Sequence, residues 1–192
     1  MAMAMLFYRF ALFLHIVGAF GLIAAVTLEA IGLRGLRRAT QGDEARMWLG
    51  ISRRLVSRLA PASLGVILLT GLFMTATAWG PQGWIAVALG SLVVLAVVGA
   101  FGTGMRMARL ETAIEPAQGM LTDELRRRLR DPVLLTSLRV RLGIVLGVAF
   151  LMTVKPSLIP SLIVIAIAAA AGWLAGQVPQ RRIQHELGNE VG

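Results

Sequence analysis

The histidine at position 15 is the residue of this chain whose chemistry most needs an explanation. The sequence has 192 residues and two histidines, and His15 lies within the apolar stretch RFALFLHIVGAFGLIAAVTLE (9–29), whereas His185 is close to the C-terminus. An ionisable side chain within a membrane span is costly, and it usually faces neighbouring helices rather than lipid. We therefore expect His15 to find its partners on other helices.

Two thioethers are expected to reach the same depth of the membrane as His15. Met74 and Met152 each stand near the outer end of an apolar block, within FMTATAW and FLMTVK. An imidazole and a thioether can ligate haem iron axially, and the same donors suit copper, because thioether sulfur favours Cu(I). His15, Met74 and Met152 are accordingly the candidate cofactor-binding residues, with haem b as the first candidate.

Other interpretations of these three residues stay open. His15 can act in proton transfer, or it can simply hydrogen-bond a threonine or a backbone carbonyl across a helix interface. Single methionines in apolar helices are commonly packing residues. The sequence contains no cysteine, and no nucleophile–base pair, paired acids or metal-ligand spacing is visible. It therefore gives no support for ordinary hydrolytic or transfer chemistry, and it excludes zinc fingers, iron–sulfur clusters and thiol nucleophiles.

Composition predicts an all-α, polytopic membrane bundle that forms a single unit over residues 1–192. The hydrophobic fraction is 57%, the charged fraction is 15% and the mean hydropathy is +0.76, and the apolar residues gather in long blocks. A soluble domain has a smaller apolar fraction and alternating stripes. Five blocks are long enough to cross about 30 Å of hydrocarbon, at about 6–33, 59–79, 84–105, 133–154 and 158–177.

The arginines predict the orientation of the five spans. Seven lie in 34–58, eight in 106–141 and two in the tail at 181–182, which leaves only Arg9 and Lys155 for the other side. The positive-inside rule then puts the N-terminus outside and the C-terminus in the cytoplasm. The net charge of +9 is assigned to anionic lipid headgroups rather than to nucleic acid. The expected location is the bacterial inner (plasma) membrane.

The second arginine-rich segment contains a short helix at about 121–131. Thr122 or Asp123 can cap it, Leu121, Leu125 and Leu129 share one face, and Pro132 ends it. We expect it to lie flat at the membrane surface with its arginines among lipid phosphates, and a docking surface for a soluble partner is the alternative.

Small residues predict how the spans pack, because lipid provides no hydrophobic force between helices. The candidate contact positions are Ala4, Ala11, Gly18, Ala25 and Gly32 in the first span, Ala100 and Gly104 in the third, Gly143 and Gly147 in the fourth, and Ala168, Gly172 and Gly176 in the fifth. The same faces would also suit a homodimer or a larger membrane complex. Glu29, about 21 Å along the first span from His15, is expected to pair with a cytoplasmic arginine.

Three stretches carry a resemblance to known membrane proteins: LFLHIVGAFG (12–21), the basic inner segment and LRVRLGIVLGVAFLMTVKP (138–156). Together they resemble an uncharacterised bacterial integral-membrane family grouped with the copper-resistance D proteins. They are also distantly similar to the membrane protoporphyrinogen oxidase family of haem synthesis. The resemblance implies a small helical bundle in which His15 is associated with haem. Ala19, Phe20 and Gly21 stand where such proteins often have a tryptophan.

Three classes of function therefore remain. The first is a haem- or metal-binding membrane protein centred on His15. The second is a non-catalytic accessory subunit of a larger membrane complex. The third is a small transporter, although the internal repeats and broken helices typical of transporters are not apparent in the sequence.

Overall fold

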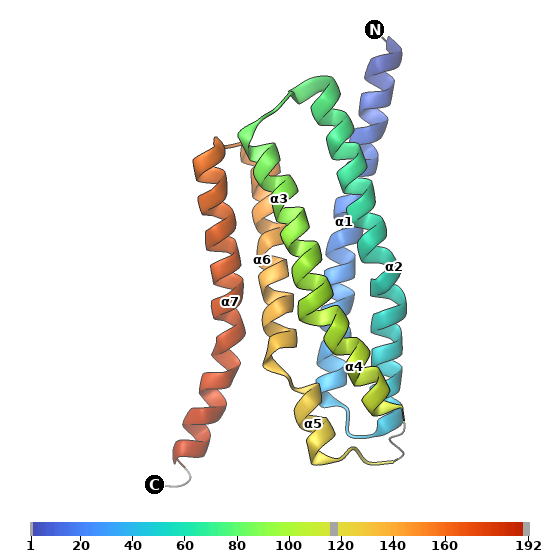
Figure 1. Cartoon of the computed structure of the whole chain (residues 1–192), viewed down its shortest axis with the longest axis vertical. Helices are drawn as coiled ribbons and strands as arrows, with labels where there is room; N and C mark the ends of the chain where they lie inside the picture. The colour runs from blue at the N-terminus through green and yellow to red at the C-terminus, as the bar shows by residue number, and fades with distance from the viewer. Residues whose placement is uncertain (1, 116–118, 190–192) are drawn as a thin grey trace.

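The structure is a computed structural model that describes residues 2–115 and 119–189, and these form a long bundle of helices (Figure 1). The helices are α1 (Ala2–Arg38), α2 (Gly42–Met74), α3 (Gly83–Val97), α4 (Met105–Ile114), α5 (Asp123–Leu129), α6 (Pro132–Val154) and α7 (Leu158–Asn189). Two π-helical segments, η1 (Thr75–Trp79) and η2 (Val98–Gly104), extend α2 and join α3 to α4. No strand is present in the described ranges, so the predicted all-α class is confirmed.

Five helical segments are long and apolar enough to cross a membrane, as the sequence predicts. They are Met5–Arg38, Gly42–Trp79, Gly83–Ile114, Asp123–Val154 and Leu158–Gln177. Many large apolar side chains of these segments are exposed, which is the pattern of a bundle surrounded by lipid.

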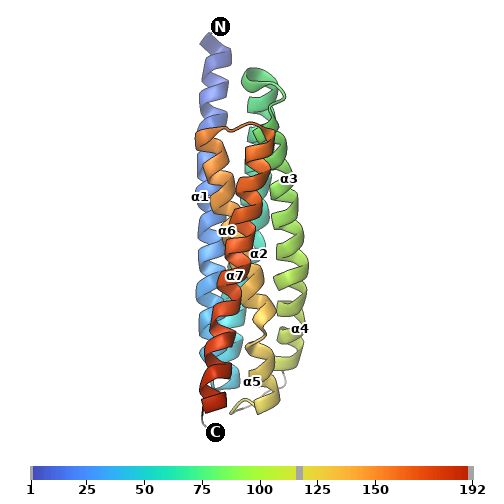
Figure 2. The same ribbon diagram turned by 90° about the vertical axis from the view of Figure 1, so that its left-hand side faces the viewer.

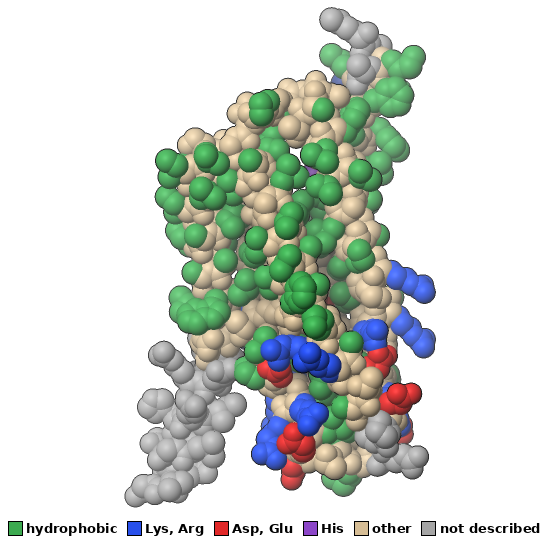
Figure 3. Space-filling view, viewed as in Figure 1, with side chains coloured by type: hydrophobic (Ala, Val, Ile, Leu, Met, Phe, Trp, Pro, Cys, Tyr) green, Lys and Arg blue, Asp and Glu red, His purple; other side chains and the backbone are tan. Residues whose placement is uncertain are grey.

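The arginine-rich segments that flank the five apolar blocks are mainly helical. The first connection is only three residues long, because α1 continues to Arg38 and α2 begins at Gly42. With 37 residues, α1 is about 55 Å long at 1.5 Å per residue, and hydrocarbon accounts for about 30 Å. Helix α1 is therefore much longer than a span of hydrocarbon requires. Charged side chains gather at the lower end of the molecule in Figure 3, around α5 and the start of α2. We call this end the charged end.

Helix α5 closes the charged end with its leucines inside. The Thr122 hydroxyl accepts a hydrogen bond from the backbone N–H of Leu125 at 3.3 Å, as a helix N-cap should. Leu121, Leu125 and Leu129 are all buried in one cluster with the ends of α1 and α4. The expectation that this helix lies flat against lipid is therefore wrong in one respect, because the bundle itself covers its apolar face.

The predicted small residues join the helices in two tight pairs. In the first pair Gly18 faces Ser63 and Ile67 of α2, and Gly32 faces Ser52. In the second pair α6 meets α7 at Gly143, Gly147, Gly172 and Gly176. A Cβ atom at Gly147 would come within 3.0 Å of Ile165, so neither pair tolerates bulk at these contacts.

The prediction for the third span is wrong in its residues. Ala100 and Gly104 are exposed, and the neighbouring Gly99 and Gly102 instead face Arg141 and Ser137 of α6. The rod made of α3, η2 and α4 packs on α6 through α3 and η2, on α7 through α3, and on α2 through α4 (Figures 1 and 2). Two cavities lie between α2 and this rod, and side chains from both line them.

Candidate functional site

The ring of His15 is held by a hydrogen bond to α2. Its Nδ1 lies 2.9 Å from the hydroxyl oxygen of Thr70, and that hydroxyl also bonds the backbone carbonyl of Val66. A hydroxyl has one proton, so Thr70 donates to the carbonyl and accepts from His15 Nδ1–H. This direction puts a proton on Nδ1, so the lone pair of the neutral imidazole lies on Nε2.

Gly71 makes the room that the imidazole occupies. A Cβ atom at this position would come 3.3 Å from His15 Cε1, which is tighter than ordinary van der Waals contact. The sequence analysis did not identify Thr70 or Gly71. The available signal was that Thr70 and Met74 are four residues apart, which places them on the same face of a helix.

The three candidate ligand residues line one cavity, as expected from their depth. His15 comes from α1, Met74 from the end of α2 and Met152 from α6. The remaining wall consists of Ile67, Gly71, Thr75, Trp79, Trp84, Ile85, Ala88, Leu89 and Leu92. The cavity volume, measured as the space open to the centre of a water molecule, is about 50 Å³. This His15 cavity is therefore a narrow apolar space with one nitrogen and two sulfur donors.

Aromatic side chains form the rim of the His15 cavity at the end opposite the charged end. The rings of Trp79 and Trp84 meet edge to face with centroids 5.9 Å apart, and Lys155 Nζ lies 4.0 Å from the centre of the Trp79 ring. Trp79 Nε1–H donates to the Tyr8 hydroxyl at 3.2 Å. These contacts fix the rim by aromatic packing and a cation–π interaction.

Three other threonine hydroxyls, near the ends of η1 and α6, hydrogen-bond their own helices. Thr75 and Thr77 donate to carbonyls of their own helix at 2.8 Å, as does Thr153 in α6 at 2.9 Å. Within the described residues, no three His, Cys, Asp or Glu side chains come together as a metal site. The candidate ligands at the His15 cavity are instead one imidazole and the two thioethers of Met74 and Met152.

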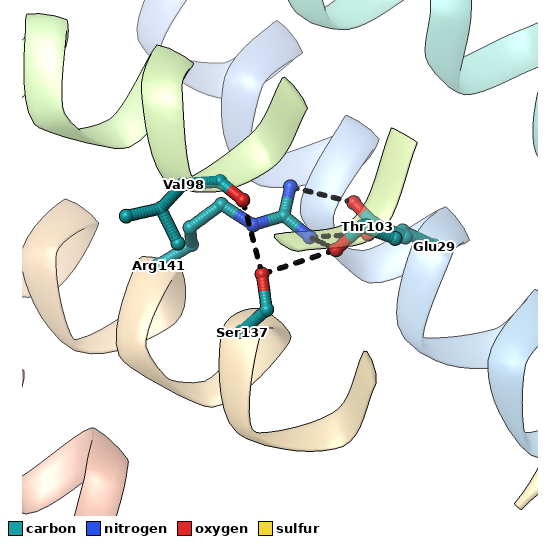
Figure 4. A network of polar contacts seen from close by, with 5 residues as sticks. All are labelled: Glu29, Val98, Thr103, Ser137 and Arg141. Carbon is teal, nitrogen blue, oxygen red and sulfur yellow. Dashed lines mark hydrogen bonds and ion pairs between the residues drawn. The ribbon is translucent and has the colours of Figure 1, made fainter. Parts of the chain in front are cut away.

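A second polar cluster lies deeper along α1, where Glu29 pairs with Arg141 (Figure 4). Arg141 Nη1 donates to Glu29 Oε2 at 2.8 Å, and Nη2 donates to Oε1, which makes the pair bidentate. Both residues are deeply buried, with exposed fractions of 4% for Glu29 and 6% for Arg141. The expected arginine partner of Glu29 is present, and it projects from within α6.

Hydroxyls extend this pair into a network that reaches η2. Arg141 Nη2 also donates to the Thr103 hydroxyl at 2.9 Å, and the Thr103 and Ser137 hydroxyls lie 3.1 Å apart. Ser137 donates to the backbone carbonyl of Val98 at 3.2 Å. Arg141 Nε is buried without a hydrogen-bond partner. The network therefore ties α1, η2 and α6 together while leaving one guanidinium N–H unused.

The Glu29–Arg141 pair stands in the wall of a larger cavity between α2 and the α3–α4 rod. Its volume open to water centres is about 340 Å³, and Ser52, Arg53, Ser57 and Thr103 provide its other polar groups. Arg53, which is half exposed, forms an ion pair with Glu111. The cavity thus connects a buried ion pair with side chains toward the charged end.

Comparisons with known proteins assign no family to this chain. No protein-family model matches it, and neither curated proteins nor solved structures give a significant match.

Proposed function

We propose that this protein is a multi-pass membrane protein that binds one haem, with His15 Nε2 as an axial ligand of the iron. The observation that carries the proposal is the hydrogen bond from His15 Nδ1–H to Thr70, which directs the ring and leaves Nε2 as the electron-pair donor. Histidines that bind metals almost always donate their other ring N–H in this way.

The residues around His15 suit a largely apolar cofactor. The wall is made almost wholly of aliphatic, aromatic and thioether side chains, which is the lining typical of cofactor sites, and the present cavity of about 50 Å³ would have to widen to hold a macrocycle. Met74 or Met152 would provide the second axial ligand. Bound haem would supply one-electron chemistry, and the protein would supply the axial ligands and an environment without water.

A monovalent copper ion is the second candidate, and the narrowness of the cavity favours it. Only about 50 Å³ is open to water centres, so a single ion needs less rearrangement than a macrocycle does. One imidazole and two thioethers form a soft donor set of the kind that selects Cu(I).

The proposed location is the bacterial inner membrane, with the N-terminus outside and the charged end in the cytoplasm. The asymmetric distribution of arginines supports this orientation. The His15 cavity then belongs to the outer half of the membrane, where a periplasmic metal or electron carrier can approach it. Anionic headgroups are the proposed partners of the arginines.

The proposal is tested by titrating the purified protein in detergent with ferric haem and recording the visible spectrum. Wild type should develop a sharp Soret band that saturates at one haem per chain. His15→Ala should lose this saturable band, because no other described side chain in the cavity wall offers a nitrogen lone pair to the iron. Met74→Leu and Met152→Leu separate the two thioethers, since only the variant that lacks the sixth ligand should shift the spectrum.

A saturable Soret band of equal size in His15→Ala would contradict the proposal. A Cu(I) titration against a coloured chelator distinguishes the second candidate, which requires all three donors. If neither haem nor copper binds and His15→Gln keeps full stability, His15 is a structural hydrogen-bonding residue. The accessory-subunit function would then take the place of this proposal.

A further inference from the structure

We propose that the Glu29–Arg141 pair is a binding site for an organic carboxylate with an apolar body, and that the acid binds together with one proton. In this exchange the ligand carboxylate replaces Glu29 on Arg141, while Glu29 takes up the proton. The site is distinct from the His15 cavity, because Glu29 lies about 21 Å further along α1. The inference therefore does not depend on haem or copper.

The size and lining of the cavity beside the pair define the class of ligand. A single water needs about 10–15 Å³ of space measured at its centre, and this cavity offers about 340 Å³. Its walls are mainly apolar, from Val56, Ala60, Pro61, Leu64, Leu95, Ala96, Ala100 and Met107. An apolar body would pack against these walls, and Ser52 and Ser57 offer hydroxyls for a polar substituent.

The guanidinium of Arg141 recognises carboxylates by its shape. It already holds one carboxylate through two parallel N–H groups, which is the geometry of bidentate recognition. Its Nε–H, buried and without a partner, is a further donor that the present arrangement leaves unused. A ligand carboxylate presents two oxygens as Glu29 does, so Arg141 can donate its hydrogen bonds to either carboxylate.

Glu29 and Arg141 belong to two different tightly packed helix pairs. Glu29 belongs to α1, which packs tightly on α2, and Arg141 belongs to α6, which packs tightly on α7. Direct contact between α1 and α6 is much less extensive than the contact within each pair. A small relative shift of the two pairs would part the carboxylate from the guanidinium without opening either glycine-lined interface.

Charge balance makes the exchange depend on a proton. The charged side chains among the described residues lining the cavity are Glu29, Arg53 and Arg141, and Arg53 is already paired with Glu111. A displaced Glu29 would thus be a buried anion without a partner, which costs several kcal/mol. The balanced step is RCOOH + Glu29⁻·Arg141⁺ → Glu29–H + RCOO⁻·Arg141⁺, so no net charge enters the membrane.

The experiment uses benzoate as the probe and benzyl alcohol as its uncharged counterpart, with purified full-length protein in detergent. Calorimetry in two buffers of different protonation enthalpy should give uptake of about one proton for each benzoate bound. The apparent affinity of wild type should then fall about tenfold for each unit rise in pH. Benzyl alcohol should not reproduce either effect.

Two variants distinguish a ligand site from a structural ion pair. Glu29→Gln leaves Arg141 without its counter-ion, so benzoate should raise the melting temperature of this variant and bind it without proton uptake. The double variant Glu29→Gln/Arg141→Gln is the matched control, and benzoate should have no effect on it. If Glu29→Gln does not fold, the proton uptake of wild type alone decides.

The proposal is overturned if benzoate binds wild type without taking up a proton, or does not bind at all. It is also overturned if the double variant is stabilised by benzoate as much as Glu29→Gln, because binding would then not involve Arg141.

Discussion

At the scale of single residues, the two polar centres of the bundle differ in how completely their hydrogen-bonding groups are used. His15 hydrogen-bonds the Thr70 hydroxyl through Nδ1 and lines an apolar cavity. Glu29 uses both carboxylate oxygens, whereas Arg141 retains one buried N–H. The first centre suits a ligand of the imidazole nitrogen, and the second suits a ligand of the guanidinium.

Thr70 is predicted to raise the affinity for the ligand indirectly, through its hydrogen bond to His15 Nδ1. Thr70→Val keeps the shape of the side chain but removes the acceptor of His15 Nδ1–H, so the ring loses its fixed orientation and tautomer. Haem affinity in the titration should fall about 10- to 100-fold. Thr77→Val is the matched control, because Thr77 bonds only its own helix. Equal affinities in wild type and Thr70→Val would mean that this hydrogen bond does not position a ligand.

Sequence reasoning identified His15, Met74 and Met152 because unusual side chains stand out in apolar blocks. It also anticipated an arginine partner for Glu29, since a buried carboxylate requires one. It could not choose Arg141 among seventeen arginines, because that choice depends on how α6 is rotated against α1. Thr70 was missed because a threonine in a span ordinarily hydrogen-bonds the backbone of its own helix, and the sequence does not show that His15 reaches it.

At the scale of helices, glycine contacts decide which helices pair. Seven-residue spacing in α1 correctly indicated one contact face, and the structure shows α2 packed against it at Gly18 and Gly32. In η2 the same reasoning chose Ala100 and Gly104, whereas Gly99 and Gly102 make the contacts. A π-helical turn shifts the face that later residues present, and helical spacing cannot anticipate such a shift.

Gly18→Leu and Gly147→Leu should each destabilise the bundle, by about 1–3 kcal/mol if overpacking here resembles that in other cores. A leucine at Gly18 meets Ser63 and Ile67, and one at Gly147 meets Ile165 and Ala168. Gly65→Leu and Gly90→Leu are the matched controls, because nothing lies within 4 Å of a Cβ at either position. Thermal unfolding in detergent provides the comparison. The packing scheme fails if all four variants melt at the same temperature.

At the scale of the whole molecule, charge separates the two ends of the bundle. Composition and block length were sufficient to predict an all-α chain with five apolar helices, because hydrocarbon thickness fixes the length of a span. They did not indicate that the arginine-rich stretches are mainly helical, because such stretches resemble loops in a hydropathy plot. The burial of the α5 leucines is likewise a consequence of tertiary packing.

The proposed orientation predicts opposite results for reporters at the two ends. A reporter active only in the cytoplasm should be active when fused after Gly192 and inactive when inserted in the turn 80–83 between η1 and α3. The arginines at the charged end would hold that end on the cytoplasmic side. The reverse pattern of activity would invert the assignment of the His15 cavity to the outer half.

The haem content of the protein as isolated tests the central claim most directly. Wild type and His15→Gln are to be produced in haem-sufficient bacterial cells, purified at equal yield and compared by haem iron per chain. The account predicts close to one haem per wild-type chain and a nearly complete loss in His15→Gln, with unchanged helix content. Equal haem content in the two proteins, or none in wild type even after reconstitution, would contradict it.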